Sequence, residues 1–263
     1  MDTQLNNKKI ISFLQEKAMR FLSLKSRYMA GASVLLLAAG CTEDPVEPHE
    51  QQTGFVTGHV INTVGAPLAN VDIVVNNSQY YNNNILGQTD TNGKYRLAIE
   101  PGSWYVRATI DVQYDNQTYT LDLHPENSNG FAGSEGAVRN FQWKLSGTRP
   151  TDFGASGFYG GAIEIVGGGE FADVDGVKLS LKPIAALIDG STGRDITKNP
   201  EGYVLQDVPI GKYEISAWYE PENRPLQIRI RNKDQAYSSK ISGSFEPVYP
   251  GATENYKITV EVK

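Results

Sequence analysis

Cysteine and histidine are scarce in this 263-residue sequence, which contains one Cys and three His. One cysteine cannot form an internal disulfide bond, nor can it supply the thiolate cluster of a structural zinc or iron–sulfur site. Three histidines leave little material for a His-rich metal site. We therefore expect neither a metal nor a cofactor.

Net positive charge is also lacking. The formal net charge is −6 and the sequence pI is near 5.2. Nucleic-acid phosphates require a basic face, so we expect no nucleic-acid partner. Hydrophobic residues make up 40% and charged residues 21% of the chain. These fractions are typical of a globular protein rather than of a disordered chain or a membrane bundle.

The N-terminal region combines a basic segment with a short apolar run. Residues 1–28 carry six basic and two acidic side chains, and residues 29–39 are apolar. A membrane-spanning helix needs roughly 20 apolar residues, whereas this shorter run after basic residues is typical of a secretory signal peptide. We predict a signal peptide at residues 1–40. Translation could start at Met1 or at Met19, which would give a signal of ordinary length.

The only cysteine directly follows the apolar run, in Leu37-Ala-Ala-Gly-Cys41. This segment resembles a bacterial lipobox, in which the cysteine is diacylated and becomes the first residue after cleavage. Ala38 stands where Leu is commoner in that motif. Several acyl chains anchor a protein firmly, so the resemblance implies membrane attachment through Cys41. The alternative is an ordinary cleavage site with a chance cysteine.

Residues 41–53 are polar, acidic and proline-containing, and we expect them to form an extended tether. The residue after the cysteine, Thr42, resembles that of lipoproteins sorted to the outer membrane. Glu43-Asp44 is similar to the surface-export signal of Bacteroidetes lipoproteins. These resemblances imply an outer-membrane lipoprotein on the periplasmic or cell-surface face. Without residues 1–40 the chain retains 18 basic and 28 acidic side chains, a net charge of −10. That charge disfavours lying flat on anionic lipid.

Beyond Gly54 the sequence consists of short β-branched and aromatic runs bounded by Gly, Pro, Asn and Asp, without a long amphipathic helix. This pattern is typical of an all-β sandwich or barrel. Asp115-Asn116 suits a tight hairpin turn. In the first half we expect strands at residues 55–62, 71–75, 94–99, 104–112, 118–123 and 138–145.

Four turn signals are spaced through this half. They are Gly58-x-Val60, Gly65-x-Pro67-Leu68-x-x-Val71, Thr89-Asp90-x-x-Gly93-x-Tyr95 and Pro101-Gly102. In this order they resemble the carboxypeptidase regulatory-like domain family. The resemblance implies a transthyretin-like (prealbumin-like, Ig-like) β-sandwich at residues 54–146. Residues 111–137, an expected hairpin and Gly-rich loop, depart from the minimal family pattern.

The second half repeats the pattern, so that Tyr213 corresponds to Trp104 and Ile215 to Val106. We therefore predict two tandem sandwiches, the second at residues 157–263. Residues 147–156, rich in Gly, Pro, Thr and Ser, are the expected linker. Strands are expected at residues 177–181, 213–217, 226–230 and 256–262.

Catalytic motifs are weak in this sequence. His124 lies near Ser128 and Ser134, but neither serine stands in a Gly-x-Ser-x-Gly elbow, and no His-Glu-x-x-His occurs. The regulatory-like family does not carry the zinc ligands of the peptidases that it accompanies. Asp173-Val-Asp175-Gly176 could offer oxygen ligands to calcium, but a solvated turn is the favoured interpretation. We predict that the protein is not an enzyme, and an envelope hydrolase using His124 is the least favoured alternative.

Four aromatic residues are the candidate ligand-binding residues: Tyr80, Tyr81, Tyr105 and Trp218. Flat rings beside Asn and Gln amides suit sugar rings or extended peptides. The alternative is that these rings pack between the modules or under the inserted loop. The leading hypothesis is a non-catalytic, lipid-anchored binding or structural module for an envelope protein or glycan. The main alternative is an accessory or spacer subunit of an outer-membrane nutrient-uptake or secretion complex.

Overall fold

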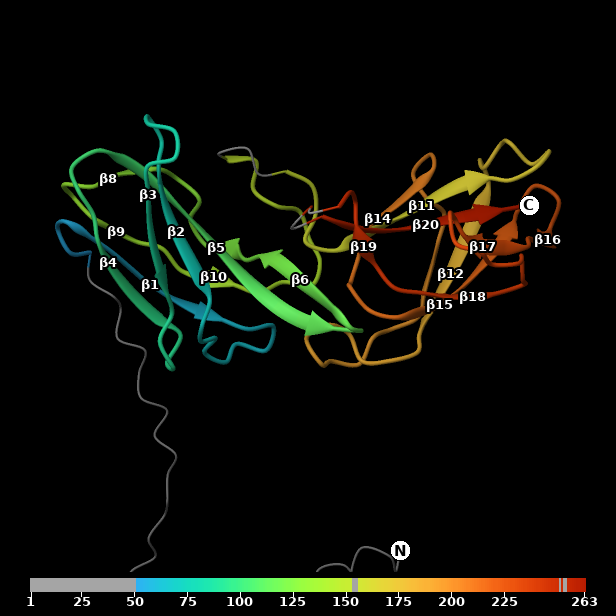
Figure 1. The fold of residues 1–263 in the computed structure, drawn as a ribbon, viewed down its shortest axis with the longest axis horizontal. Helices are drawn as coiled ribbons and strands as arrows, with labels where there is room; N and C mark the ends of the chain where they lie inside the picture. Colours follow the sequence, from blue (N-terminus) through green and yellow to red (C-terminus); the bar gives the residue numbers. More distant parts are fainter. Residues whose placement is uncertain (1–50, 153–155, 251, 253–254) are drawn as a thin grey trace, which may run out of the picture. The chain divides into compact units, whose positions relative to one another are not determined.

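The computed structural model describes residues 51–152, 156–250, 252 and 255–263. The expected signal peptide, Cys41 and most of the expected tether lie outside these residues. The described residues are all-β, which confirms the predicted fold class (Figure 1). They contain no α-helix, and so no helix long and apolar enough to cross a membrane.

The first sandwich consists of two five-stranded sheets. One sheet contains β1 (Phe55–Ile61), β4 (Lys94–Ala98), β7 (His124–Pro125), β9 (Ala137–Val138) and β10 (Phe141–Gln142). Its order is β4-β1-β10-β7, and β9 also pairs with β1. The other sheet contains β2 (Asp72–Asn77), β3 (Asn84–Gln88), β5 (Ser103–Tyr114), β6 (Gln117–Asp122) and β8 (Phe131–Ala132). Its order is β3-β2-β5-β6, and β8 also pairs with β5.

The second sandwich also has two five-stranded sheets. One contains β11 (Gly161–Gly167), β14 (Val204–Val208), β17 (Ile228–Ile230), β19 (Glu246–Pro247) and β20 (Tyr256–Val262), in the order β14-β11-β20-β17 with β19 also on β20. The other contains β12 (Val177–Pro183), β13 (Ile196–Lys198), β15 (Tyr213–Tyr219), β16 (Arg224–Pro225) and β18 (Ile241–Gly243). Its order is β13-β12-β15-β16, and β18 also pairs with β15.

The two sandwiches share one topology, strand for strand, apart from β9 and β19. Corresponding strands form a parallel pair in each, β1 with β10 and β11 with β20, and in the first sandwich β1 also pairs in parallel with β9. Trp104 lies opposite Asn77 of β2, and Tyr213 lies opposite Pro183 of β12. The correspondence of Tyr213 with Trp104 expected from the repeat therefore holds in the sheet register. β9 pairs with β1, whereas β19 pairs with β20.

Alternating side chains of these strands build the core. Trp104, Val106 and Ala108 of β5 are buried, as are Tyr213 and Ile215 of β15. Successive side chains of a strand point to opposite faces, so one face of each sheet is apolar and packed. Full burial of each large aliphatic side chain stabilises the fold by about 1.5–3 kcal/mol.

Gly58 of the first turn signal has a steric role. A Cβ atom at this position would lie 1.9 Å from the carbonyl oxygen of Arg139 and 2.8 Å from the ring of Tyr95. The Tyr95 hydroxyl donates a hydrogen bond to the same carbonyl at 2.6 Å. Because the backbone at residue 139 lies directly against β1, only glycine fits at position 58.

Two predicted segments differ from the structure. The strand expected at residues 138–145 is replaced by two short strands, β9 and β10, and residues 143–145 are not in a strand. The break falls at Arg139 and Asn140, whose polar groups bond to other strands: Asn140 Oδ1 accepts the backbone N–H of His59 at 3.1 Å. No strand was expected between residues 75 and 94, but Asn84–Gln88 form β3. That strand lies at a sheet edge and pairs only with β2.

The hairpin expected at Asp115-Asn116 is confirmed. Both residues have positive φ, 46° and 63°, as a two-residue type I′ turn requires. β5 and β6 continue outward to this turn, where Tyr114 pairs with Gln117.

The tip of this hairpin contacts the second sandwich through hydrogen bonds. The Tyr119 hydroxyl donates to the Phe245 carbonyl at 2.8 Å, and the Thr120 N–H donates to the Tyr256 hydroxyl at 2.7 Å. The Tyr119 and Tyr256 rings are 4.7 Å apart. Desolvation raises the pKa of Tyr119 far above its ordinary value. The segment that departs from the family pattern thus joins the two sandwiches.

Tyr114 adds a second contact at the hairpin tip. Its hydroxyl donates to the Ala186 carbonyl at 2.7 Å and accepts the Lys212 N–H at 3.0 Å. The Lys212 Nζ atom lies 3.0 Å from the Asp115 carboxylate, which also accepts from Ser244. These hydrogen bonds lower the pKa of Asp115 below its ordinary value.

We expect Tyr114→Phe to lower the free energy of unfolding by about 1–2 kcal/mol, because it leaves the Ala186 carbonyl and the Lys212 N–H without their hydroxyl partner. Urea denaturation followed by tryptophan fluorescence measures this change. Tyr203→Phe, at an exposed position, is the matched control. Equal stabilities of the two variants would contradict the role assigned to the Tyr114 hydroxyl.

Candidate functional site

The solvent side of β3, β2 and β5 carries three cross-strand rows of side chains, and we call this surface the outer face. The rows are Asn84–Asn76–Tyr105, Leu86–Val74–Arg107 and Gln88–Asp72–Thr109. Their neighbours along the strands, such as Ile73 and Val106, are buried in the core. Strand alternation therefore directs the three rows away from the core.

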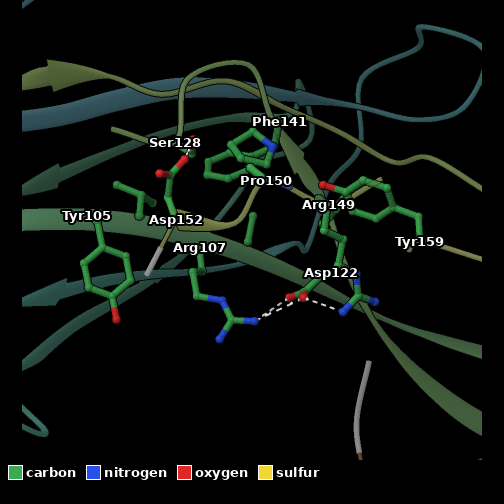
Figure 2. Close-up of a pocket in the computed structure, with 13 residues that line it drawn as sticks. Tyr105, Arg107, Asp122, Ser128, Phe141, Arg149, Pro150, Asp152 and Tyr159 are labelled. Atoms are coloured by element: carbon green, nitrogen blue, oxygen red, sulfur yellow. Dashed lines mark hydrogen bonds and ion pairs between the residues drawn. The ribbon is translucent and has the colours of Figure 1, made fainter. Parts of the chain in front are cut away.

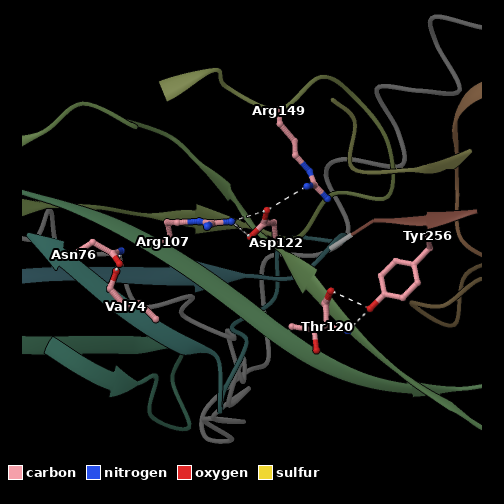
Figure 3. Close-up of polar contacts among 7 residues, drawn as sticks. All are labelled: Val74, Asn76, Arg107, Thr120, Asp122, Arg149 and Tyr256. Carbon is pink, nitrogen blue, oxygen red and sulfur yellow. Dashed lines mark hydrogen bonds and ion pairs between the residues drawn. The ribbon is translucent and has the colours of Figure 1, made fainter. Parts of the chain in front are cut away.

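The row that contains Tyr105 places an aromatic ring beside two amides. Tyr105 is half-buried, lies opposite Asn76 in β2, and Asn76 in turn lies opposite Asn84 in β3. The Asn76 amide donates to the Val74 carbonyl at 3.1 Å, which fixes its orientation (Figure 3). Together these residues offer an apolar ring and nearby hydrogen-bonding groups.

Tyr80 and Tyr81 lie in the β2–β3 loop, at the same end of the sheet as this row. The Asn77 side chain accepts the Tyr80 N–H at 3.0 Å, and the Ser78 N–H donates to the Ser103 carbonyl at 2.9 Å. The base of the loop is therefore held to β2 and β5. Both rings are exposed, with Tyr80 at 66% and Tyr81 fully exposed. The structure thus brings three of the four candidate aromatics to one end of one sheet.

Trp218, the fourth candidate, belongs to the second sandwich. It lies in β15, opposite Lys178 of β12 and Pro225 of β16. Its side chain faces solvent with 39% of its surface exposed. Trp218 therefore does not join the three tyrosines, and its role as a ligand-binding residue stays a prediction.

An ion-pair cluster borders the outer face where β6 ends (Figures 2 and 3). The Asp122 carboxylate lies 2.9 Å from the Arg107 guanidinium and 3.3 Å from that of Arg149. The side chains of Asp122 and Arg149 are only 9% and 5% exposed. Arg149 comes from the segment predicted as the linker, so the cluster fixes that segment against the first sandwich.

Further contacts hold the segment around Arg149. Backbone hydrogen bonds connect Arg149 N with Gly157 O at 2.9 Å and Tyr159 N with Gly147 O at 3.0 Å. The Asp207 carboxylate of the second sandwich accepts the Gly147 N–H at 2.8 Å. The described part of the linker is thus bonded to both sandwiches.

A small cavity lies beside the cluster, and Figure 2 shows Tyr105, Arg107, Ser128 and Asp152 on its wall. Its volume is about 40 Å³. A water molecule occupies about 30 Å³ of liquid, so this space suits water rather than a sugar ring. The Ser128 hydroxyl donates to Asp152 at 2.5 Å across it.

His124 lacks the surroundings of a nucleophilic triad. Its Nδ1 atom is 3.0 Å from the Tyr159 hydroxyl, and the two rings meet edge to face. Burial and the nearby Lys144 lower the pKa of His124. Ser128 donates its hydrogen bond to Asp152 and not to His124. The described contact of His124 is therefore with Tyr159 of the second sandwich, and this contact is structural.

The acidic turn considered as a calcium site bonds to its own backbone. Asp173 Oδ1 accepts the Asp175 N–H at 2.9 Å. Among the described residues, no group of three or more His, Cys, Asp or Glu side chains is placed to hold a metal ion.

Sequence reasoning missed the cluster of Arg107, Asp122 and Arg149. Arg107 and Asp122 occur in alternating strand patterns, where charged residues usually face solvent. Arg149 lies in a Thr-Arg-Pro segment with the composition of an exposed loop. No local pattern signals that such a residue will be buried, because its partner comes from a distant strand.

Comparisons with known proteins give only remote likenesses. No family model matches the chain, so its resemblance to the carboxypeptidase regulatory-like family stays a prediction. No curated protein matches it either.

Solved structures that resemble the chain include the Bacillus anthracis TIE protein, at 14% identity and a TM-score of 0.30 over 81% of this chain and 34% of that one. A streptococcal ancillary pilin has 11% identity and a TM-score of 0.25, over 79% of this chain and 62% of that one. The major pilin of Streptococcus pyogenes has 14% identity and a TM-score of 0.24, over 81% and 99%. The chain therefore spans less than two thirds of the length of the first two. The fold assigned to it rests on its own sheet topology.

We expect Asp122→Asn to lower the free energy of unfolding by about 3 kcal/mol, because two guanidinium groups would lose the carboxylate between them. Chemical denaturation measures the loss. Asp111→Asn removes an exposed carboxylate from the same hairpin and should change stability by less than about 0.5 kcal/mol. A small effect of Asp122→Asn, equal to that of the control, would show that the cluster does not hold the linker.

Proposed function

We propose that this protein is a non-catalytic binding module of the cell envelope, attached to the outer membrane by lipid on Cys41. In this proposal the two sandwiches stand at the end of the acidic tether, on the periplasmic or cell-surface face. The outer face of the first sandwich contacts a neutral glycan or an envelope protein. Tyr80, Tyr81 and Tyr105 are its contact residues.

The row of Tyr105, Asn76 and Asn84 is the observation that supports this proposal. An aromatic ring gives apolar contact to one face of a sugar, and amides bond the hydroxyls around its rim. The exposed rings of Tyr80 and Tyr81 lie in the loop at the same end of the sheet. Tyr105, Asn76 and Asn84 lie on strands backed by a packed core, which lowers the cost of ordering these three side chains on binding.

The hairpin contact favours a second candidate function, that of a spacer subunit in an outer-membrane uptake or secretion complex. Tyr114 and Tyr119 bond the first sandwich to the second. Two sandwiches held in this way can transmit a fixed spacing between a membrane anchor and a partner. A spacer needs no ligand on the outer face, and this difference separates the two functions.

We expect Cys41→Ser to abolish labelling of the protein by a fatty-acid analogue in cells and to release it from membranes, because the thioether that carries the acyl chains cannot form. Membrane fractionation and gel fluorescence measure both effects. Unchanged partitioning into the membrane fraction would overturn the lipid anchor.

We expect Tyr81→Ala and Tyr105→Ala each to weaken glycan binding roughly tenfold, because each removes one stacking ring. A glycan array first identifies the neutral oligosaccharides that the protein binds. Calorimetry then measures the affinity of each variant for them. Tyr203→Ala removes an exposed ring from the second sandwich and should leave the affinity unchanged.

The same variants distinguish the spacer function from the glycan-binding function. A stable complex recovered from envelope extracts, unaffected by Tyr81→Ala and accompanied by no glycan signal, would support the spacer and contradict the binding surface.

A further inference from the structure

A wide groove lies on the second sandwich, away from the outer face. It encloses about 590 Å³, within the range of small-molecule binding sites. Its walls come from the ends of β17, β18 and β19 and from the middle of β20. No part of the proposed function uses this groove.

The groove arises from a gap in the sheet edge beside β20. β17 pairs with β20 from Val260 to Val262, whereas β19 pairs with it at Tyr256 and Lys257. Ile258 and Thr259 lie between these two partners and line the groove. Gly243 of β18 also lines it and contributes no side chain. Strand pairing therefore builds the floor of the groove, and the turn that follows β17, at residues 231–235, supplies part of its wall.

Four basic side chains line the groove, although the chain as a whole is acidic: Lys212, Arg231, Lys233 and Lys257. The one acidic residue in the lining is Glu246, which pairs with Lys233 at 2.8 Å. Lys212 pairs with Asp115 and Lys257 with Glu164, at 3.0 and 2.7 Å. These two carboxylates come from outside the lining.

Arg231 is the one basic side chain of the lining for which no ion pair is found among the described residues. It is exposed, and its charge helps to lower the pKa values of Glu164 and Glu261, which lie farther away than an ion pair. Its backbone is fixed, since its N–H donates to the Thr259 carbonyl at 2.9 Å. A guanidinium group binds carboxylates through two parallel hydrogen bonds, which a lysine cannot reproduce.

The other polar groups of the groove are neutral: Asn232, Gln235, Ser242, Ser244 and Thr259. Hydroxyl and amide groups of this kind match the hydroxyls of a sugar. A single small anion would occupy only a fraction of the volume, and a nucleic acid would require a basic face much larger than one groove.

We propose that this groove binds an acidic oligosaccharide, with Arg231 holding a sugar carboxylate and the neutral side chains bonding the hydroxyls. The acidic remainder of the protein repels a polyanion, whereas the lining of the groove holds four basic side chains and one acidic side chain. This site is separate from the tyrosine surface of the first sandwich and goes beyond the proposed function.

The test is calorimetric titration of the full chain with tetragalacturonate at low ionic strength, where charge contacts are least screened. We expect one binding site, weakening with salt, and no comparable heat from the neutral tetragalactose of the same linkage. Arg231→Gln should weaken binding roughly tenfold or more, and Arg231→Lys should have an intermediate effect. Arg194→Gln, at an exposed position outside the groove, is the matched control.

Thermal unfolding of each variant verifies that the fold is intact. Tyr105→Ala should leave the affinity for tetragalacturonate unchanged, even if it abolishes neutral glycan binding.

Three results would overturn the inference. They are an absence of tetragalacturonate binding, equal affinity of Arg231→Gln and Arg194→Gln, and inorganic phosphate binding as tightly as the oligosaccharide.

Discussion

The hydrogen bonds of Tyr119 and Tyr256 connect the two halves of this protein. Both phenols are buried, and a buried hydroxyl without a partner destabilises a fold. Tyr119 belongs to the first sandwich and bonds the Phe245 carbonyl, whereas Tyr256 belongs to the second and bonds the backbone of Thr120. Each sandwich thus satisfies a polar group of the other. Separating them would expose two aromatic rings and break both sets of bonds, so the pair is held together as a unit.

The segment between the sandwiches is constrained by the same principle. Its composition is that of a flexible linker, yet Arg149 is buried against Asp122, and Asp207 binds the Gly147 N–H from the other side. A buried guanidinium requires a counter-charge, which Asp122 supplies to Arg149. Asp122 also forms an ion pair with Arg107 on the outer face. One carboxylate therefore contacts both Arg149 of the linker and Arg107 of the outer face.

The sequence predicted the parts of this fold that depend on local order. Alternation located β5 and β15 and identified Trp104 and Tyr213 as equivalent core residues, and Asp115-Asn116 predicted a turn with two positive φ angles. It did not predict β3, because Asn84 and its polar neighbours have loop composition and become a strand only by pairing with β2. The break at Arg139-Asn140, the burial of Arg149 and the separation of Trp218 from the tyrosines depend on partners far away in the chain. The periodicity of a single segment does not reveal contacts with residues far away in the sequence.

The repeat itself indicates where the two sandwiches can differ in function. Their core strands correspond, so selection for packing explains what they share, such as Trp104 and Tyr213 at the same register position. The candidate sites lie where the correspondence ends. The hairpin of β5 and β6 is longer than that of β15 and β16, and the outer-face position of Tyr105 is taken by Glu214 in the second sandwich. β9 pairs with β1, but β19 pairs with β20 and opens the groove around Arg231. A duplicated sandwich can therefore keep one core while a change in strand pairing gives each copy a different surface.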